Sequence, residues 1–72
     1  MSTPQMLPID STMLSHVGYD PTTQEIHATY RNGGVTHAYA CSPAMWASFQ
    51  AAESKGKWFH ANIDRNKGRR IG

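Results

Sequence analysis

Residues 24–41 read QEIHATYRNGGVTHAYAC, a sequence typical of a β-hairpin. From Gln24 to Arg31 apolar and polar side chains alternate, which is the period of a half-buried strand. The Asn-Gly-Gly run at 32–34 supplies the positive backbone angles of a tight turn, and residues 35–41 return as the next strand. The turn is centred either on residues 32–33 or on residues 33–34. Both registers place the same side chains on one face of the hairpin: Ile26, Ala28, Tyr30, Val35, His37 and Tyr39.

The segment before the hairpin predicts one more strand, from Met13 to Tyr19. A turn follows at residues 20–23, where Pro21 pre-sets its own backbone angle and the Asp20 carboxylate can accept from backbone amides two residues further on. Residues 1–10 contain two prolines and no periodicity, so we expect a flexible lead-in there.

The segment after the hairpin predicts a helix that begins at Ser42-Pro43, since serine caps free amide groups and proline suits the first helical position. Apolar residues then recur at three- and four-residue spacing, and Gly56 is expected to end the helix in a left-handed cap. A second, short helical turn is predicted around residues 58–63. From Arg65 onward apolar content nearly vanishes, so disorder is expected.

These elements predict an α+β fold with a three-stranded antiparallel meander, one packed helix, a short second helical turn and flexible termini. The expected division is a lead-in at 1–10, a β-β-β-α domain at 11–64 and a basic tail at 65–72. A chain of 72 residues buries a smaller share of its surface than a larger domain does, so its core must be well packed. The predicted core consists of Tyr19, Ile26, Tyr30, Tyr39, Trp46, Phe49, Trp58, Phe59 and Ile63.

The sequence argues against a membrane-spanning, a secreted or a disulfide-bonded protein. No stretch approaches the roughly 20 apolar residues of a membrane span, and residues 1–10 lack the features of a signal peptide. The only cysteine, Cys41, permits no intrachain disulfide and fits a reducing compartment, so we expect a cytoplasmic protein.

Catalytic and metal chemistry also lack their usual patterns. His16, His27, His37, His60 and Cys41 form no close ligand pairs, so no metal is predicted. The cysteine has no basic residue within three positions, and the carboxylates lie in separate elements. We therefore expect neither an enzyme nor a cofactor.

Charge is distributed unevenly along the chain. Residues 55–72 hold six Lys and Arg against one Asp, a net charge of +5, whereas residues 1–54 hold one Arg against four acidic residues. Such a cluster is typical of contact with phosphates or an acidic protein surface, although a solvated tail has the same composition. Trp58, which lies among these cations, either stacks on a base or, as we favour, packs in the core. The candidate binding residues are Lys55, Lys57, Arg65, Lys67, Arg69 and Arg70.

A protein partner is a second interpretation of the same chain. A three-stranded sheet has two edges, and an edge strand is a ready template for an extended peptide. The partner would then contact either an edge of the sheet or its exposed face.

Four segments in this order resemble the KTSC domain family: 17–20, 30–35, 52–59 and Ile63. The resemblance covers about residues 11–70. It implies a β-β-β-α module without a catalytic motif, found at the C-terminus of some lysyl-tRNA synthetases and alone in bacteria and phages. The chain departs from the family at Thr36 and Ala38, where aromatic residues are common, and at Cys41-Ser42, where an apolar residue commonly precedes the proline.

A free-standing chain of this length also resembles small phage regulators of transcription. That resemblance implies binding to host RNA polymerase near the N-terminus of its largest subunit, displacement of the initiation factor and antitermination. The charge of the basic tail is compatible with contact to RNA phosphates beside such a polymerase, and we expect no membrane partner and a monomer. The alternative is an RNA- or tRNA-binding accessory module without catalytic activity, and a third interpretation is a folding or assembly partner that contacts no nucleic acid.

Overall fold

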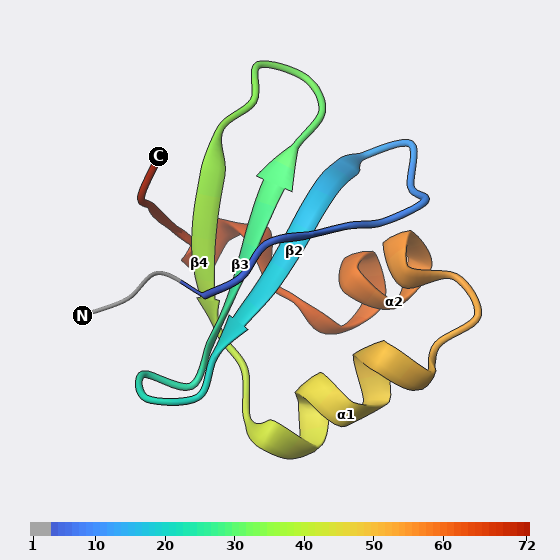
Figure 1. Ribbon diagram of the computed structural model, residues 1–72, viewed down its shortest axis with the longest axis vertical. Coiled ribbons are helices and arrows are strands. Elements are labelled where there is room, and N and C mark those ends of the chain that lie inside the picture. The colour runs from blue at the N-terminus through green and yellow to red at the C-terminus, as the bar shows by residue number, and fades with distance from the viewer. Residues whose placement is uncertain (1–3) are drawn as a thin grey trace.

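A five-stranded antiparallel sheet and two helices make up the computed structural model, which describes residues 4–72 (Figure 1). The strands lie side by side in the order in which they occur along the chain. The elements are β1 (Leu7–Pro8), β2 (Leu14–Asp20), β3 (Glu25–Tyr30), β4 (Thr36–Ala40), α1 (Pro43–Ala51), α2 (Lys55–Asn62), the 3-10 turn η1 (Arg65–Lys67) and β5 (Arg69–Arg70).

The predicted hairpin is confirmed as β3 and β4. Ile26 lies opposite Tyr39 in the register of the two strands. The Tyr30 N–H donates to the Val35 carbonyl at 2.9 Å, so the turn is centred on residues 32–33. Gly33 has φ +88° and residue 34 has φ +66°, the left-handed conformation that glycine adopts without steric cost.

The predicted three-stranded sheet with flexible termini is wrong, because both ends of the described chain add an edge strand. Leu7 pairs with Val17 of β2, and β5 pairs with β4. Beyond β5, the Ile71 N–H donates to the Thr36 carbonyl at 2.9 Å, and the Thr36 N–H donates to the Gly72 carbonyl at 3.0 Å. A three-stranded sheet would leave the outer backbone groups of β2 and β4 unpaired, and the chain's own ends satisfy them. Residues 1–3 of the predicted lead-in lie outside the described residues.

The prediction for the helices is partly confirmed. The Ser42 hydroxyl accepts from the Met45 N–H at 3.2 Å and begins α1 as predicted. The short second helical turn is in fact the eight-residue helix α2, which Ser54 caps by accepting from the Lys57 N–H at 3.3 Å. Gly56 lies within α2 and does not end α1, since it has no positive φ. Among the described residues, neither helix is long and apolar enough to cross a membrane.

The core lies between the sheet and the helices. Of the predicted core residues, five are buried and four are partly buried against them. The buried ones are Ile26, Tyr39, Phe49, Phe59 and Ile63, and the partly buried ones are Tyr19, Tyr30, Trp46 and Trp58. The prediction lacked five other buried apolar residues: Leu14, Val17, Ala28, Ala38 and Cys41. Phe59 joins the layers, since its ring meets the Tyr39 ring edge-on at 5.4 Å.

The opposite face of the sheet is crossed by the N-terminal segment, drawn dark blue in Figure 1. A Cβ atom on Gly18 would lie only 2.7 Å from the Gln5 carbonyl oxygen, so the segment approaches β2 as closely as a glycine allows. Arg31 holds the following loop by donating to the Ser11 carbonyl. The N-terminal segment therefore covers part of the sheet face that lies opposite the helices.

Candidate nucleic-acid interface

The C-terminal cations are positioned by a turn and an edge strand. In η1 the Asp64 carboxylate accepts from the Asn66 N–H at 3.0 Å, which closes the turn. A Cβ atom on Gly68 would lie 2.3 Å from the ring of Tyr39, so only glycine lets the chain pass over that ring. The chain then runs along β4 as β5. The predicted disorder of this segment is wrong, because its backbone is hydrogen-bonded to the sheet.

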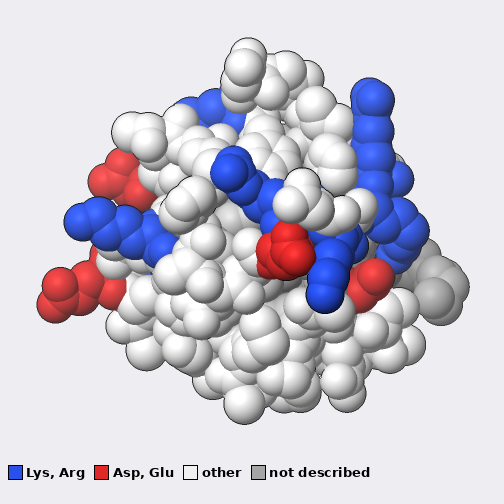
Figure 2. Space-filling model, turned by 180° about the vertical axis from the view of Figure 1, so that it is seen from behind, with Lys and Arg blue, Asp and Glu red and all other residues white. Residues whose placement is uncertain are grey.

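We define the C-terminal basic surface as the four cations Arg65, Lys67, Arg69 and Arg70. All four are exposed. Figure 2 shows Lys and Arg side chains spread across the side of the molecule that faces away from the viewer in Figure 1, with acidic residues close beside several of them. An exposed array of guanidinium and ammonium groups can contact phosphate oxygens without reading base sequence.

Arg69 already has a carboxylate partner within the chain. Its Nη2 atom lies 2.7 Å from Oε1 of Glu25, the first residue of β3. The hydrogen bond from Arg69 lowers the pKa of the Glu25 carboxyl group. The same Oε1 atom lies 3.9 Å from Nε2 of His27. Sequence reasoning missed Glu25 because it lies 44 residues from Arg69, and only the sheet register brings the two together.

Lys55 is used inside the fold and does not join the basic surface. Its Nζ atom donates to the carbonyls of Gln50 and Ala52, at 3.3 and 2.9 Å, where α1 ends. It also lies 5.8 Å from the centre of the Phe49 ring. Lys55 therefore satisfies carbonyl groups that the end of a helix leaves unpaired.

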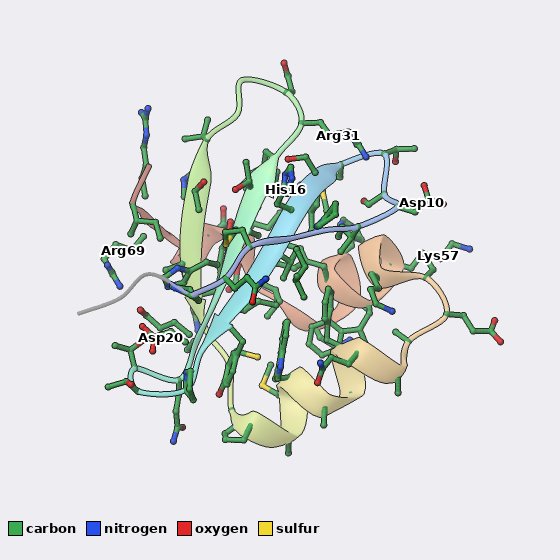
Figure 3. The ribbon with its side chains drawn as sticks, viewed as in Figure 1. Asp10, His16, Asp20, Arg31, Lys57 and Arg69 are labelled. Atoms are coloured by element: carbon green, nitrogen blue, oxygen red, sulfur yellow. The ribbon has the colours of Figure 1, made fainter. Side chains whose placement is uncertain are left out.

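Lys57 lies apart from Arg69, and it lines a pocket together with Met13, whose sulfur atom lies 3.5 Å from Nη1 of Arg65. Figure 3 shows Lys57 and Arg69 on opposite sides of the molecule. The six cations predicted as one binding set are thus divided into the C-terminal basic surface, one lysine at the end of α1 and one lysine beside a pocket.

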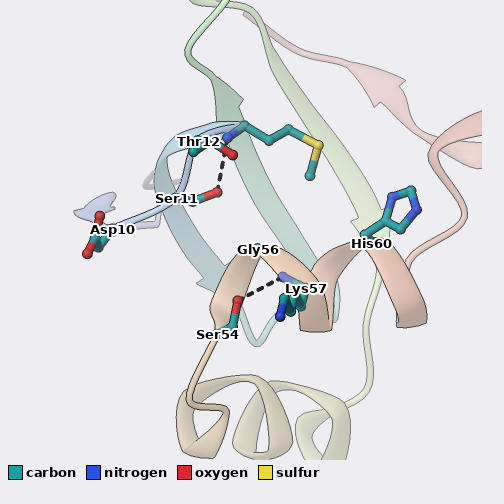
Figure 4. A pocket seen from close by; sticks show the side chains of 8 residues that line it. Asp10, Ser11, Thr12, Ser54, Gly56, Lys57 and His60 are labelled. Carbon is teal, nitrogen blue, oxygen red and sulfur yellow. Dashed lines mark hydrogen bonds between the residues drawn. The ribbon is translucent and has the colours of Figure 1, made fainter.

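That pocket, of about 640 Å³, opens between the loop before β2 and the start of α2 (Figure 4). The hydroxyl oxygens of Ser11 and Ser54 accept hydrogen bonds there from backbone N–H groups of the chain itself. The lining residues are Asp10, Ser11, Thr12, Met13, Ser54, Gly56, Lys57 and His60.

The remaining reactive side chains do not converge. Within residues 4–72, no group of three or more His, Cys, Asp or Glu side chains is placed to hold a metal ion. Cys41 is buried, and burial raises the pKa of its thiol. Thiolate chemistry is correspondingly disfavoured there. That the chain is no enzyme stays a prediction.

Comparisons with known proteins agree with the resemblance seen in the sequence. The model of the KTSC domain family matches residues 10–66. The crystal structure of a KTSC domain protein from Yersinia pestis is similar to this chain with a TM-score of 0.80 and 30% sequence identity, over 97% of this chain and 100% of that chain. A comparison with curated proteins gives no match. The chain therefore belongs to the KTSC domain family.

Proposed function

We propose that this KTSC domain is a transcription regulator of the phage type. It binds bacterial RNA polymerase near the N-terminus of the largest subunit, hinders initiation by displacing the initiation factor and promotes antitermination. The observation that carries the proposal is the separation of a packed apolar body from an exposed C-terminal basic surface. Such a molecule offers one surface to a protein and another to the nucleic acid beside it.

An apolar groove next to α1 suits the protein partner. It has a volume of about 240 Å³, and Leu7, Trp46 and Phe49 are among its lining residues. Leu7 is 47% exposed, and the Trp46 ring stacks between the rings of Phe49 and Tyr19 at centroid distances of 5.3 and 5.1 Å. Rigid aromatic side chains beside an apolar groove are typical anchor points of protein interfaces.

The first experiment is retention of purified bacterial RNA polymerase by the tagged chain at low salt. We expect the parent chain to retain polymerase and Leu7→Glu to weaken retention, because the new charge would line the groove. Ile71→Glu is the matched control, since Ile71 is also an exposed large apolar residue, 39% exposed, but belongs to the other edge of the sheet. If the parent chain retains no polymerase, the proposed function is wrong.

An RNA- or tRNA-binding accessory module is the second candidate function. It is favoured by Arg65, Lys67 and Arg70, which are exposed and form no ion pair with a carboxylate among the described residues. Replacing all four cations of the basic surface with glutamine separates the two candidates. A polymerase regulator should keep much of its retention of polymerase, whereas an RNA-binding module should lose its function with its RNA affinity.

A further inference from the structure

We propose that Glu25 keeps Arg69, one member of the C-terminal basic surface, from binding phosphate. A single-stranded RNA backbone then contacts Arg65, Lys67 and Arg70, and it gains Arg69 only when the Arg69–Glu25 pair opens. This inference rests on the proposed function in one respect, because both require the C-terminal basic surface to face nucleic acid. The inference goes further by giving Glu25, a carboxylate on the sheet, control over how many cations of the surface bind phosphate.

The two side chains of the pair differ in solvent exposure, and this difference decides which of them can change its partner. The Glu25 side chain is 22% exposed and lies on β3, whereas the Arg69 side chain is 60% exposed and lies on the edge strand. Only one Arg69–Glu25 contact is formed, from Nη2 to Oε1, and a guanidinium group carries five N–H donors. The more exposed arginine can therefore turn from the carboxylate to a phosphate in solvent, which opens the pair, while Glu25 stays in place on β3.

Other charged groups near the pair do not take over the role of Glu25. Asp20 lies opposite Glu25 in the β2–β3 register. Its carboxylate accepts from the backbone N–H groups of Thr22 and Thr23, at 2.9 and 3.4 Å. His27 is buried, with no hydrogen-bond partner for its Nε2 atom. Glu25 is thus the carboxylate that contacts Arg69.

The Arg69–Glu25 pair is weak enough for Arg69 to leave Glu25 and bind a phosphate. A solvent-exposed ion pair shifts an equilibrium by about fivefold at most, so a phosphate that binds the arginine can compete with the carboxylate. RNA is a better fit than an acidic peptide, because peptide binding draws on buried apolar anchors. The basic surface itself consists of four exposed cations.

The test is the salt dependence of binding between the isolated chain and a fluorescent uridine oligonucleotide, without polymerase. Three cations without a carboxylate partner among the described residues predict a slope of about −2 in a plot of log affinity against log salt, at about −0.7 per phosphate. We expect Glu25→Gln to steepen the slope toward about −3 and to tighten binding about two- to fivefold at low salt. Arg69→Gln should leave the parent slope nearly unchanged, whereas Arg70→Gln should flatten it.

A double variant separates exchange of Arg69 from a general charge effect. The gain from Glu25→Gln should disappear in the Arg69→Gln background. Asp64→Asn is the charge-matched control, because Asp64 lies among the same cations without pairing to Arg69, so its gain should persist in that background. Thermal melting checks that each variant is folded.

Three results would overturn the inference. They are no binding of the oligonucleotide by the parent chain, equal losses from Arg69→Gln and Arg70→Gln, or a gain from Glu25→Gln that survives in the Arg69→Gln background. Each of these leaves retention of polymerase unaffected, so the proposed function is tested separately.

Discussion

Gly68 is the residue that lets the C-terminal segment reach the sheet. Its α-carbon passes over the Tyr39 ring so closely that a Cβ atom would overlap ring atoms at 2.3 to 2.9 Å. Burial of Tyr39 and its hydrogen bond with Tyr30 raise the pKa of the Tyr39 hydroxyl well above its ordinary value, so the ring stays neutral in the core. The position of the basic surface thus depends on contact between one glycine and one buried ring.

We predict that Gly68→Ala detaches β5 while the rest of the sheet stays folded. An aromatic ring in a packed core cannot yield to the added methyl group without loss of packing. Amide hydrogen exchange should speed up roughly tenfold or more at Ile71 and Gly72, with little change in β3. Gly34→Ala is the control, since nothing lies within 4 Å of that position and its cost comes from its φ of +66°. Unchanged protection of Ile71 in Gly68→Ala would contradict the role of Gly68.

The Arg69–Glu25 pair predicts a pH dependence of stability. The pKa of Glu25 is lower in the folded state than in the unfolded state, where it is about 4.3. The pair therefore contributes its full stabilisation above that pH, and the contribution is lost as the pH falls through the folded-state pKa. Glu25→Gln should lower the melting temperature at pH 7 by about 4–8 °C at most, and the difference should vanish in acid. A difference that persists at pH 2 would contradict this account.

At the scale of elements, α2 depends on its N-terminal cap. Ser54 begins the helix by accepting from the Lys57 N–H, and the residues at its start line the pocket shown in Figure 4. We predict that Ser54→Ala destabilises the chain by about 1 kcal/mol in urea denaturation, because a backbone N–H loses its partner. Ser54→Asp, which keeps an acceptor at the same position, should retain most of the stability. Equal losses in both variants would show that the cap has no such role.

The elements differ in how far the sequence could predict them. The hairpin and the start of α1 follow from local signals, the Asn-Gly-Gly turn and Ser42-Pro43, and both are confirmed. The strands β1 and β5 have only two residues each and carry Pro8 or two arginines. Local propensity therefore favours no strand there, and pairing to β2 and β4 produces them.

The same limit applies to the candidate site. The basic composition of residues 55–72 indicated cations as binding residues, but not which of them the fold already uses. The roles of Lys55 at the end of α1 and of Arg69 on Glu25 depend on tertiary contacts. Sequence spacing carries no signal for the Arg69–Glu25 contact.

At the scale of the whole molecule, stability depends on the few large side chains between sheet and helices. Phe49 is 2% exposed and packs against both tryptophans. We predict that Phe49→Ala costs about 3–5 kcal/mol, enough to unfold so small a domain at room temperature. Phe49→Leu, which keeps much of the volume, should remain folded. Far-ultraviolet circular dichroism with thermal melting checks both, and a parent-like melt of Phe49→Ala would refute the core assignment.

Titration of purified bacterial RNA polymerase with the fluorescently labelled chain is the most direct test of the proposed function. The parent chain should bind saturably at low salt without added nucleic acid. The variant with glutamine at positions 65, 67, 69 and 70 should keep much of that affinity, because the groove beside Trp46 supplies the protein contact. No saturable binding of the parent chain, or binding that appears only when nucleic acid is added, would contradict the proposal that this KTSC domain is a polymerase-binding regulator.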